Sequence, residues 1–136
     1  MRALLLIILL TLFGCGCGSV QAQAVAADQL AGAVNVAVGE LATAYGAEGD
    51  RLIAAAESRP EAEALLEAHR KRWDPVWLAL QGFAELHDGA ATELEAGRPL
   101  GPGLLARLHA AFCRFASVAA ERAVRMPQLV PCGVTP

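Results

Sequence analysis

Four cysteines are the side chains in this sequence with the clearest potential for covalent chemistry: Cys15, Cys17, Cys113 and Cys132. Exported proteins meet an oxidising environment, so disulfide pairing has to be considered. Thirteen helical steps from Cys113 to Met126 cover about 20 Å, and six extended steps back to Cys132 cover about the same distance. A tail that turns after Met126 and runs back along the preceding helix predicts a Cys113–Cys132 disulfide. The alternative is two buried free thiols.

The three histidines give little support for a metal site. His69 and His87 are 18 residues apart on one expected helix, about 27 Å, which is too far for a shared ion. No glutamate stands three residues before a histidine, as in di-iron bundles, and the Cys-x-x-Cys-His motif of covalent haem is absent. We expect no metal and no cofactor, although a single histidine of the second helix could meet His109 or Met126 across the bundle and hold a haem or copper ion.

Patterns typical of catalysis and of nucleic-acid binding are equally weak. The sequence has no Gly-x-Ser-x-Gly motif and no glycine-rich phosphate loop, and Ser58 has the position of a helix cap. We therefore expect that the protein is not an enzyme. With 11 basic and 14 acidic residues, the formal net charge is −3, so there is no overall basic field and nucleic acid is not an expected partner.

The N-terminal segment has the pattern of an export signal. Arg2 is followed by an apolar run over residues 3–13, and the next charge is Asp28. As a helix the run would span about 16 Å, too short for a hydrocarbon core of about 30 Å. We predict a signal peptide over residues 1–14, a flexible tether over 15–23 and a folded domain over 24–136.

The sequence Leu12-Phe13-Gly14-Cys15 resembles the lipobox of bacterial lipoproteins, with Phe13 larger than the small residue usual at that place. The resemblance implies that Cys15 is the lipid attachment site, which makes the membrane a partner. Gly16 after it implies sorting to the outer membrane, facing the periplasm. Ordinary cleavage after residue 22 or 24 is the main alternative and would give a periplasmic or secreted protein. An uncleaved anchor is the third possibility.

The first part of the folded domain has helical periodicity. Apolar residues every three to four positions over 24–57 predict one amphipathic helix. Gly32, Gly39 and Gly46 recur every seven residues beside the apolar stripe, although each glycine costs about 1 kcal/mol relative to alanine. They predict a smooth groove for close approach of another helix, within the fold, in a protein partner or in a second copy. A break near Gly46–Gly49 would turn this segment into two helices.

Two further helices are expected. Ser58-Arg59-Pro60-Glu61 is a capping box that begins the second helix, and glycine and proline end it at residues 97–99. The apolar stripe keeps its phase across Pro75, which favours one kinked helix over two. A third helix is expected over residues 104–125. Short connections predict an all-α, small antiparallel three-helix bundle, or four helices if the first one breaks, with the C-terminal tail folded back on the last helix.

The charged residues indicate one contact surface. Arg70 and Arg72 stand near Trp77, and this group is the best candidate for a partner contact. Together, these features predict a non-enzymatic, exported, lipid-anchored helical protein of the cell envelope with a binding or structural role. The alternatives are a periplasmic helical bundle that binds a metal or haem, and a phage-type lysis accessory or partner-binding subunit.

Overall fold

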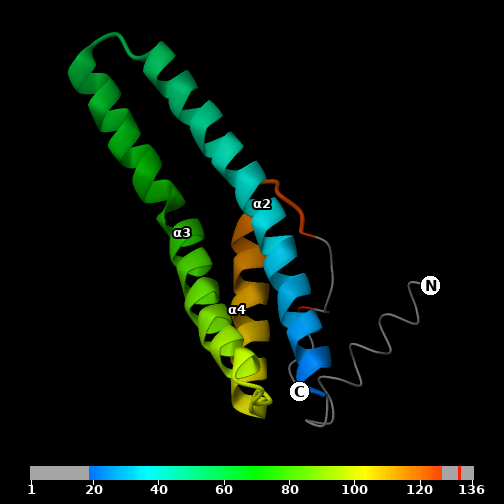
Figure 1. Ribbon diagram of the computed structural model, residues 1–136. Coiled ribbons are helices and arrows are strands. Elements are labelled where there is room, and N and C mark those ends of the chain that lie inside the picture. The colour runs from blue at the N-terminus through cyan, green and yellow to red at the C-terminus, as the bar shows by residue number, and fades with distance from the viewer. Residues whose placement is uncertain (1–18, 127–131, 133–136) are drawn as a thin grey trace.

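The computed structural model describes residues 19–126 and Cys132, which form an antiparallel three-helix bundle (Figure 1). Helix α2 spans Val20–Ala55, α3 spans Arg59–Glu95 and α4 spans Pro102–Ala120. The described part contains no strand. This confirms the all-α prediction in its three-helix form. The expected signal peptide and Cys15 lie outside the described residues.

Helix α2 is continuous and starts earlier than expected. It passes through Gly46 and Gly49 without a break, so the four-helix alternative is wrong. It begins at Val20 because the hydroxyl of Ser19 accepts a hydrogen bond from the backbone N–H of Ala22 at 3.2 Å. Residues 20–23, expected in the flexible tether, are therefore the first turn of the helix.

The capping box at the start of α3 is formed as predicted. Ser58 Oγ accepts from the backbone N–H of Glu61 at 3.4 Å, and Glu61 Oε2 accepts from the backbone N–H of Glu57 at 2.9 Å. The helix continues through Pro75, and Figure 1 shows a bend near its middle. It ends at Glu95, two residues before Gly97, whose φ of 72° places it in the left-handed region that glycine adopts without steric cost.

Helix α4 is shorter than expected, because it ends at Ala120 and not near Arg125. Ala123 adopts a left-handed φ of 61°, and the backbone N–H of Val124 donates back to Ala119 O at 3.1 Å. This reversal brings the side chain of Val124 into the core, where it is 6% exposed. A left-handed residue at a helix end is usually glycine or asparagine, so an alanine there gives no sequence signal.

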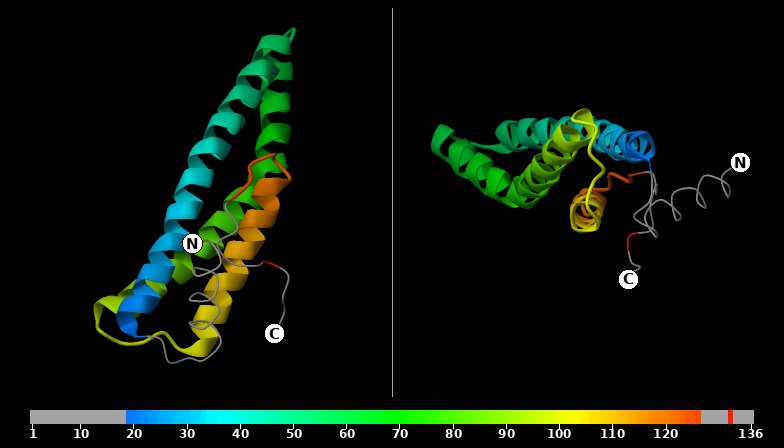
Figure 2. Two further views of the ribbon diagram at one scale, coloured as in Figure 1. Left: turned by 90° about the vertical axis from the view of Figure 1, so that its right-hand side faces the viewer. Right: turned by 60° about the horizontal axis from the view of Figure 1, so that its bottom comes forward.

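The core lies where all three helices meet, which is only along half of the hairpin formed by α2 and α3. Both figures show α2 and α3 side by side and α4 against the half near Val20 and Glu95 (Figures 1 and 2). The α2 side is mainly small residues, and α3 and α4 contribute the large rings of Trp73, Phe83 and Phe112. In the half beyond α4, residues 42–68, no side chain is fully buried.

Candidate functional site

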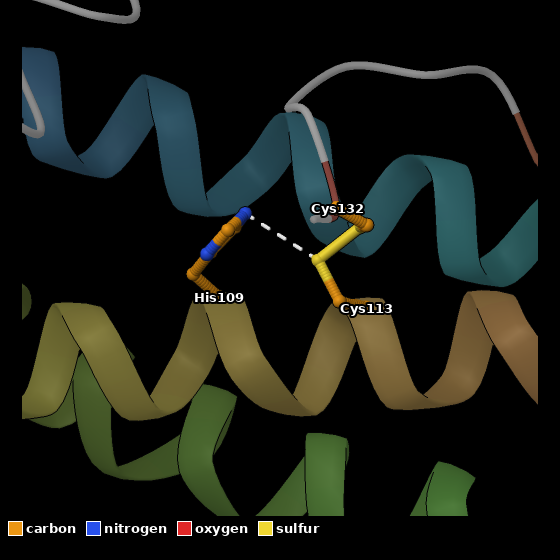
Figure 3. Close-up of side chains that lie close together, drawn as sticks. All are labelled: His109, Cys113 and Cys132. Atoms are coloured by element: carbon orange, nitrogen blue, oxygen red, sulfur yellow. Dashed lines mark hydrogen bonds between the residues drawn. A yellow bond between two sulfur atoms is a disulfide. The ribbon is translucent and has the colours of Figure 1, made fainter. Parts of the chain in front are cut away.

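The predicted disulfide is present. Cys113 on α4 is bonded to Cys132, with their Cα atoms 5.4 Å apart. Figure 3 shows the tail residue lying over the face of α4 that carries Cys113. The bond closes a loop with a sequence separation of 19 residues and holds Cys132 against the last helix, as the predicted fold-back of the tail requires. The alternative, two buried free thiols, is therefore wrong.

A histidine lies beside this disulfide. His109 is one helical turn before Cys113, and its Nε2 atom is 3.4 Å from Cys113 Sγ (Figure 3). The Sγ atom of Cys132 completes a group of three metal-type ligand atoms that all lie within 4.8 Å of one another. Burial lowers the pKa of His109 below its ordinary value, which favours the neutral imidazole.

The sequence contains one local signal for this group. A histidine and a cysteine four residues apart on a helix lie on the same face. The spacing of His109 and Cys113 indicates a metal site only together with a third ligand, Cys132, which is distant in the sequence.

The other two histidines pack against aromatic rings within the α2–α3 hairpin. His69 is 1% exposed, donates from Nε2 to Tyr45 O at 3.0 Å and stacks on the Tyr45 ring at 4.5 Å. His87 stacks on Phe83, with the ring centroids 5.9 Å apart. Within the described part of the chain, His109 is the histidine that belongs to a group of three ligand-type side chains. A shared ion between His109 and another histidine therefore has no support in the geometry.

A polar and aromatic cluster marks the level at which α4 ends. Glu48 on α2 accepts from Trp73 Nε1 at 3.0 Å and pairs with Arg72 at 2.9 Å, and its Oε2 lies 3.6 Å from His69 Nδ1. The Trp73 hydrogen bond, aided by the charge of Arg72, lowers the pKa of Glu48. Arg122, just after α4, lies over the Trp73 ring at 5.1 Å and donates to Arg72 O. The cluster thus fastens the end of α4 to both long helices.

The predicted contact patch lies next to this cluster. Trp77 is half-buried, and its ring is 6.0 Å from the Trp73 ring and 5.8 Å from the Tyr45 ring. Arg70 is exposed and pairs with Glu67 at 2.8 Å. Because both arginines of the patch already have acidic partners in the chain, their charges are partly neutralised before any partner arrives.

The three regularly spaced glycines face solvent. A Cβ atom added at Gly32, Gly39 or Gly46 would meet nothing within 4 Å. The groove is therefore not used for packing within the described fold. Val25 and Val36 on the same face of α2 are 52% and 65% exposed. Self-association or partner binding through this face remains a prediction.

A groove runs between α3 and α4. It has a volume of about 780 Å³, and small or apolar residues of both helices line it together with Arg107 and Arg114. Ala79, Gly82 and Ala111 leave the space that larger side chains would fill. Neither arginine has an acidic partner among the described residues. The groove therefore combines apolar lining residues with two arginines that have no acidic partner in the described part of the chain.

Comparison with known proteins assigns the chain to no family. No family model matches the chain, and neither a curated protein nor a solved structure is significantly similar to it. Among the described helices, none has the length and apolar content needed to cross a bilayer.

Proposed function

We propose that this chain is an exported, non-enzymatic binding protein of the cell envelope, anchored in the outer membrane by lipid on Cys15 and facing the periplasm. The observation that carries the proposal is the Cys113–Cys132 disulfide. Disulfides persist in oxidising compartments and are rare where cellular thiol systems keep cysteines reduced. The bond therefore supports export, which the N-terminal pattern predicts independently.

The first turn of α2 supports cleavage at Cys15 over the later sites. Gln23 is 3% exposed, and its Oε1 accepts from the backbone N–H of Leu100 at 2.7 Å. Cleavage after residue 24 would remove this buried hydrogen bond together with the Ser19 cap, and cleavage after residue 22 would remove the cap and place a charged amine on Gln23 itself. Cleavage before Cys15 leaves both features intact.

Incorporation of a labelled fatty acid tests the anchor. In the bacterial envelope, the wild-type chain should incorporate an alkyne-bearing fatty acid, and its intact mass should correspond to residues 15–136 plus lipid, less two hydrogens for the disulfide. Cys15→Ala should remove the label. Cys17→Ala is the matched control, because it changes a neighbouring cysteine and should retain the label.

Two results would contradict the anchor, and a third would remove the support for export. A mature chain that begins at residue 23 or 25 would show ordinary signal cleavage. A labelled Cys15→Ala variant would place the lipid elsewhere. Recovery of both Cys113 and Cys132 as free thiols from cells, with alkylation before lysis, would remove the support for export.

The α3–α4 groove supports the binding role and indicates a ligand class. An apolar floor with two arginines that lack an acidic partner among the described residues suits an anionic amphiphile with one hydrocarbon chain, because the chain would cover the floor and the head would pair with Arg107 and Arg114. The volume of about 780 Å³ lies within the range of about 300–1,000 Å³ typical of ligand pockets. A membrane-anchored protein would meet such molecules at the bilayer surface.

A pair of matched ligands tests this site. A long-chain fatty acid should bind more tightly than the fatty alcohol of the same length, because only the acid carries the charge. Replacing Arg107 and Arg114 by alanine should weaken binding of the acid by about 2- to 30-fold, since exposed ion pairs contribute about 0.2–1 kcal/mol each. Arg125→Ala is the control, because Arg125 is exposed and does not line the groove. Equal affinities for acid and alcohol would reject the ligand class.

A further inference from the structure

The group formed by His109, Cys113 and Cys132 has the composition of a zinc site. Zinc is bound in proteins by cysteine thiolates and histidine nitrogens, and a site with two cysteines and one histidine leaves a fourth position for water. His109 and Cys113 are held on one face of α4, one turn apart, so two of the three ligands come from a rigid element. Figure 3 shows both side chains directed towards Cys132.

The distance between the two helix ligands fits tetrahedral coordination. With Zn–N of about 2.0–2.1 Å, Zn–S of about 2.3 Å and a tetrahedral angle, a nitrogen and a sulfur on one zinc lie about 3.6 Å apart. His109 Nε2 lies 3.4 Å from Cys113 Sγ. Helix α4 therefore already places this pair at the required separation, without a change of backbone.

The two sulfurs cannot bind zinc as they stand, because they are bonded to each other. Around a zinc ion they would lie about 3.8 Å apart by the same geometry. The site therefore requires reduction of the disulfide first. Cys132 is exposed and lies in the tail, not in a helix, so a reductant and an ion can reach it.

We propose that Cys113 and Cys132 have two alternative states, a disulfide and a zinc-bound dithiolate completed by Nε2 of His109. A dithiol, or two molecules of a monothiol, supplies two electrons and two protons, forms a new disulfide and converts the Cys113–Cys132 bond into two thiols. Zn²⁺ then displaces the two thiol protons and binds both sulfurs and the imidazole. This inference goes beyond the proposed function and does not depend on lipid attachment at Cys15.

Metal titration of the reduced protein tests the proposal. The full-length chain would carry Cys15→Ser and Cys17→Ser, so that Cys113 and Cys132 are its only thiols. After reduction with a phosphine under anaerobic conditions, Co²⁺ should bind with one ion per chain and give a thiolate-to-metal charge-transfer band. Zn²⁺ should displace it. The oxidised protein should bind neither ion at the same concentrations.

Two variants separate a three-ligand site from binding by thiols alone. His109→Ala should weaken Zn²⁺ binding by about tenfold or more, whereas the control His87→Ala should leave it unchanged, because His87 packs on Phe83. Cys132→Ser should abolish the charge-transfer band, and circular dichroism would verify that the helices persist. The proposal is overturned if the reduced chain binds no metal, if His109→Ala binds as tightly as the parent chain, or if the oxidised protein binds equally well.

Discussion

Replacement of Gln23 by alanine should destabilise the bundle, because Gln23 is the hydrogen-bond partner of a buried backbone group 77 residues away. Gln23 and Leu100 are each 3% exposed, so water does not replace the lost acceptor. An unsatisfied buried N–H costs about 1–3 kcal/mol, and loss of a buried methylene adds about 0.8 kcal/mol. Gln23 Nε2 itself has no partner among the described residues, so its removal offsets roughly 1 kcal/mol. The net expectation is a loss of about 1–3 kcal/mol in the free energy of unfolding.

Urea denaturation followed by circular dichroism measures this change. Gln29→Ala is the matched control, because Gln29 is an exposed glutamine on the same helix and should change stability by less than about 0.5 kcal/mol. Gln23→Met nearly preserves the side-chain volume and removes the hydrogen bond together with the unpaired Nε2, so it should lose about 0.8 kcal/mol less than Gln23→Ala. If Gln23→Ala and Gln29→Ala were equally stable, the contact between Gln23 and Leu100 would not hold the start of α2 in place.

Three further outcomes are expected. Reduction of the Cys113–Cys132 disulfide without added metal should lower the free energy of unfolding by about 3 kcal/mol, the loop-entropy value for a separation of 19 residues; equal urea midpoints for both forms would contradict this. Because the folded-state pKa of Glu48 is lowered, its contribution to stability is present above the unfolded-state pKa and is lost as pH falls through the folded-state pKa. Denaturation curves measured at a series of acidic pH values should therefore show a smaller decline in the free energy of unfolding for Glu48→Gln than for the wild type. Gly39→Ala should raise stability by about 0.5–1 kcal/mol, since the added methyl group meets open space; a loss of stability, or a change in oligomeric state by light scattering, would show that this face is in contact with another chain.

Features set by local chemistry could be predicted from the sequence. The apolar stripes gave the three helices, because burial on one face imposes a period of about 3.6 residues. The capping box at Ser58 depends on two side chains three residues apart, and the glycine stop at Gly97 on one backbone angle. The Cys113–Cys132 pair was predicted from helix and strand rise with the helix taken to reach Met126; α4 ends at Ala120, so the pairing is correct although the distances assumed for it are not.

Features set by distant or unusual contacts could not be predicted in this way. The bond between Gln23 and Leu100 joins residues 77 positions apart and has no local pattern. The end of α4 depends on a left-handed alanine, Ala123, a conformation that its sequence does not indicate. Whether the face with Gly32, Gly39 and Gly46 is packed or exposed depends on which side of α2 the other helices cover. The spacing of seven residues between these glycines fits a packed face and a solvent face equally well.

The half of the hairpin beyond α4 has a consequence for how the protein opens. Residues 42–68 contain no fully buried side chain, whereas the part of α2 beside α4 buries Leu30, Val34 and Leu41. The tip of this segment, residues 50–65, can lose its structure without exposing the core, at a cost well below that of global unfolding, whereas Tyr45 and Glu48 contact the buried His69 and Trp73. The backbone amides of the tip should exchange with deuterium first, at rates set by local fraying, while the amides around Leu30 exchange only when the whole bundle unfolds.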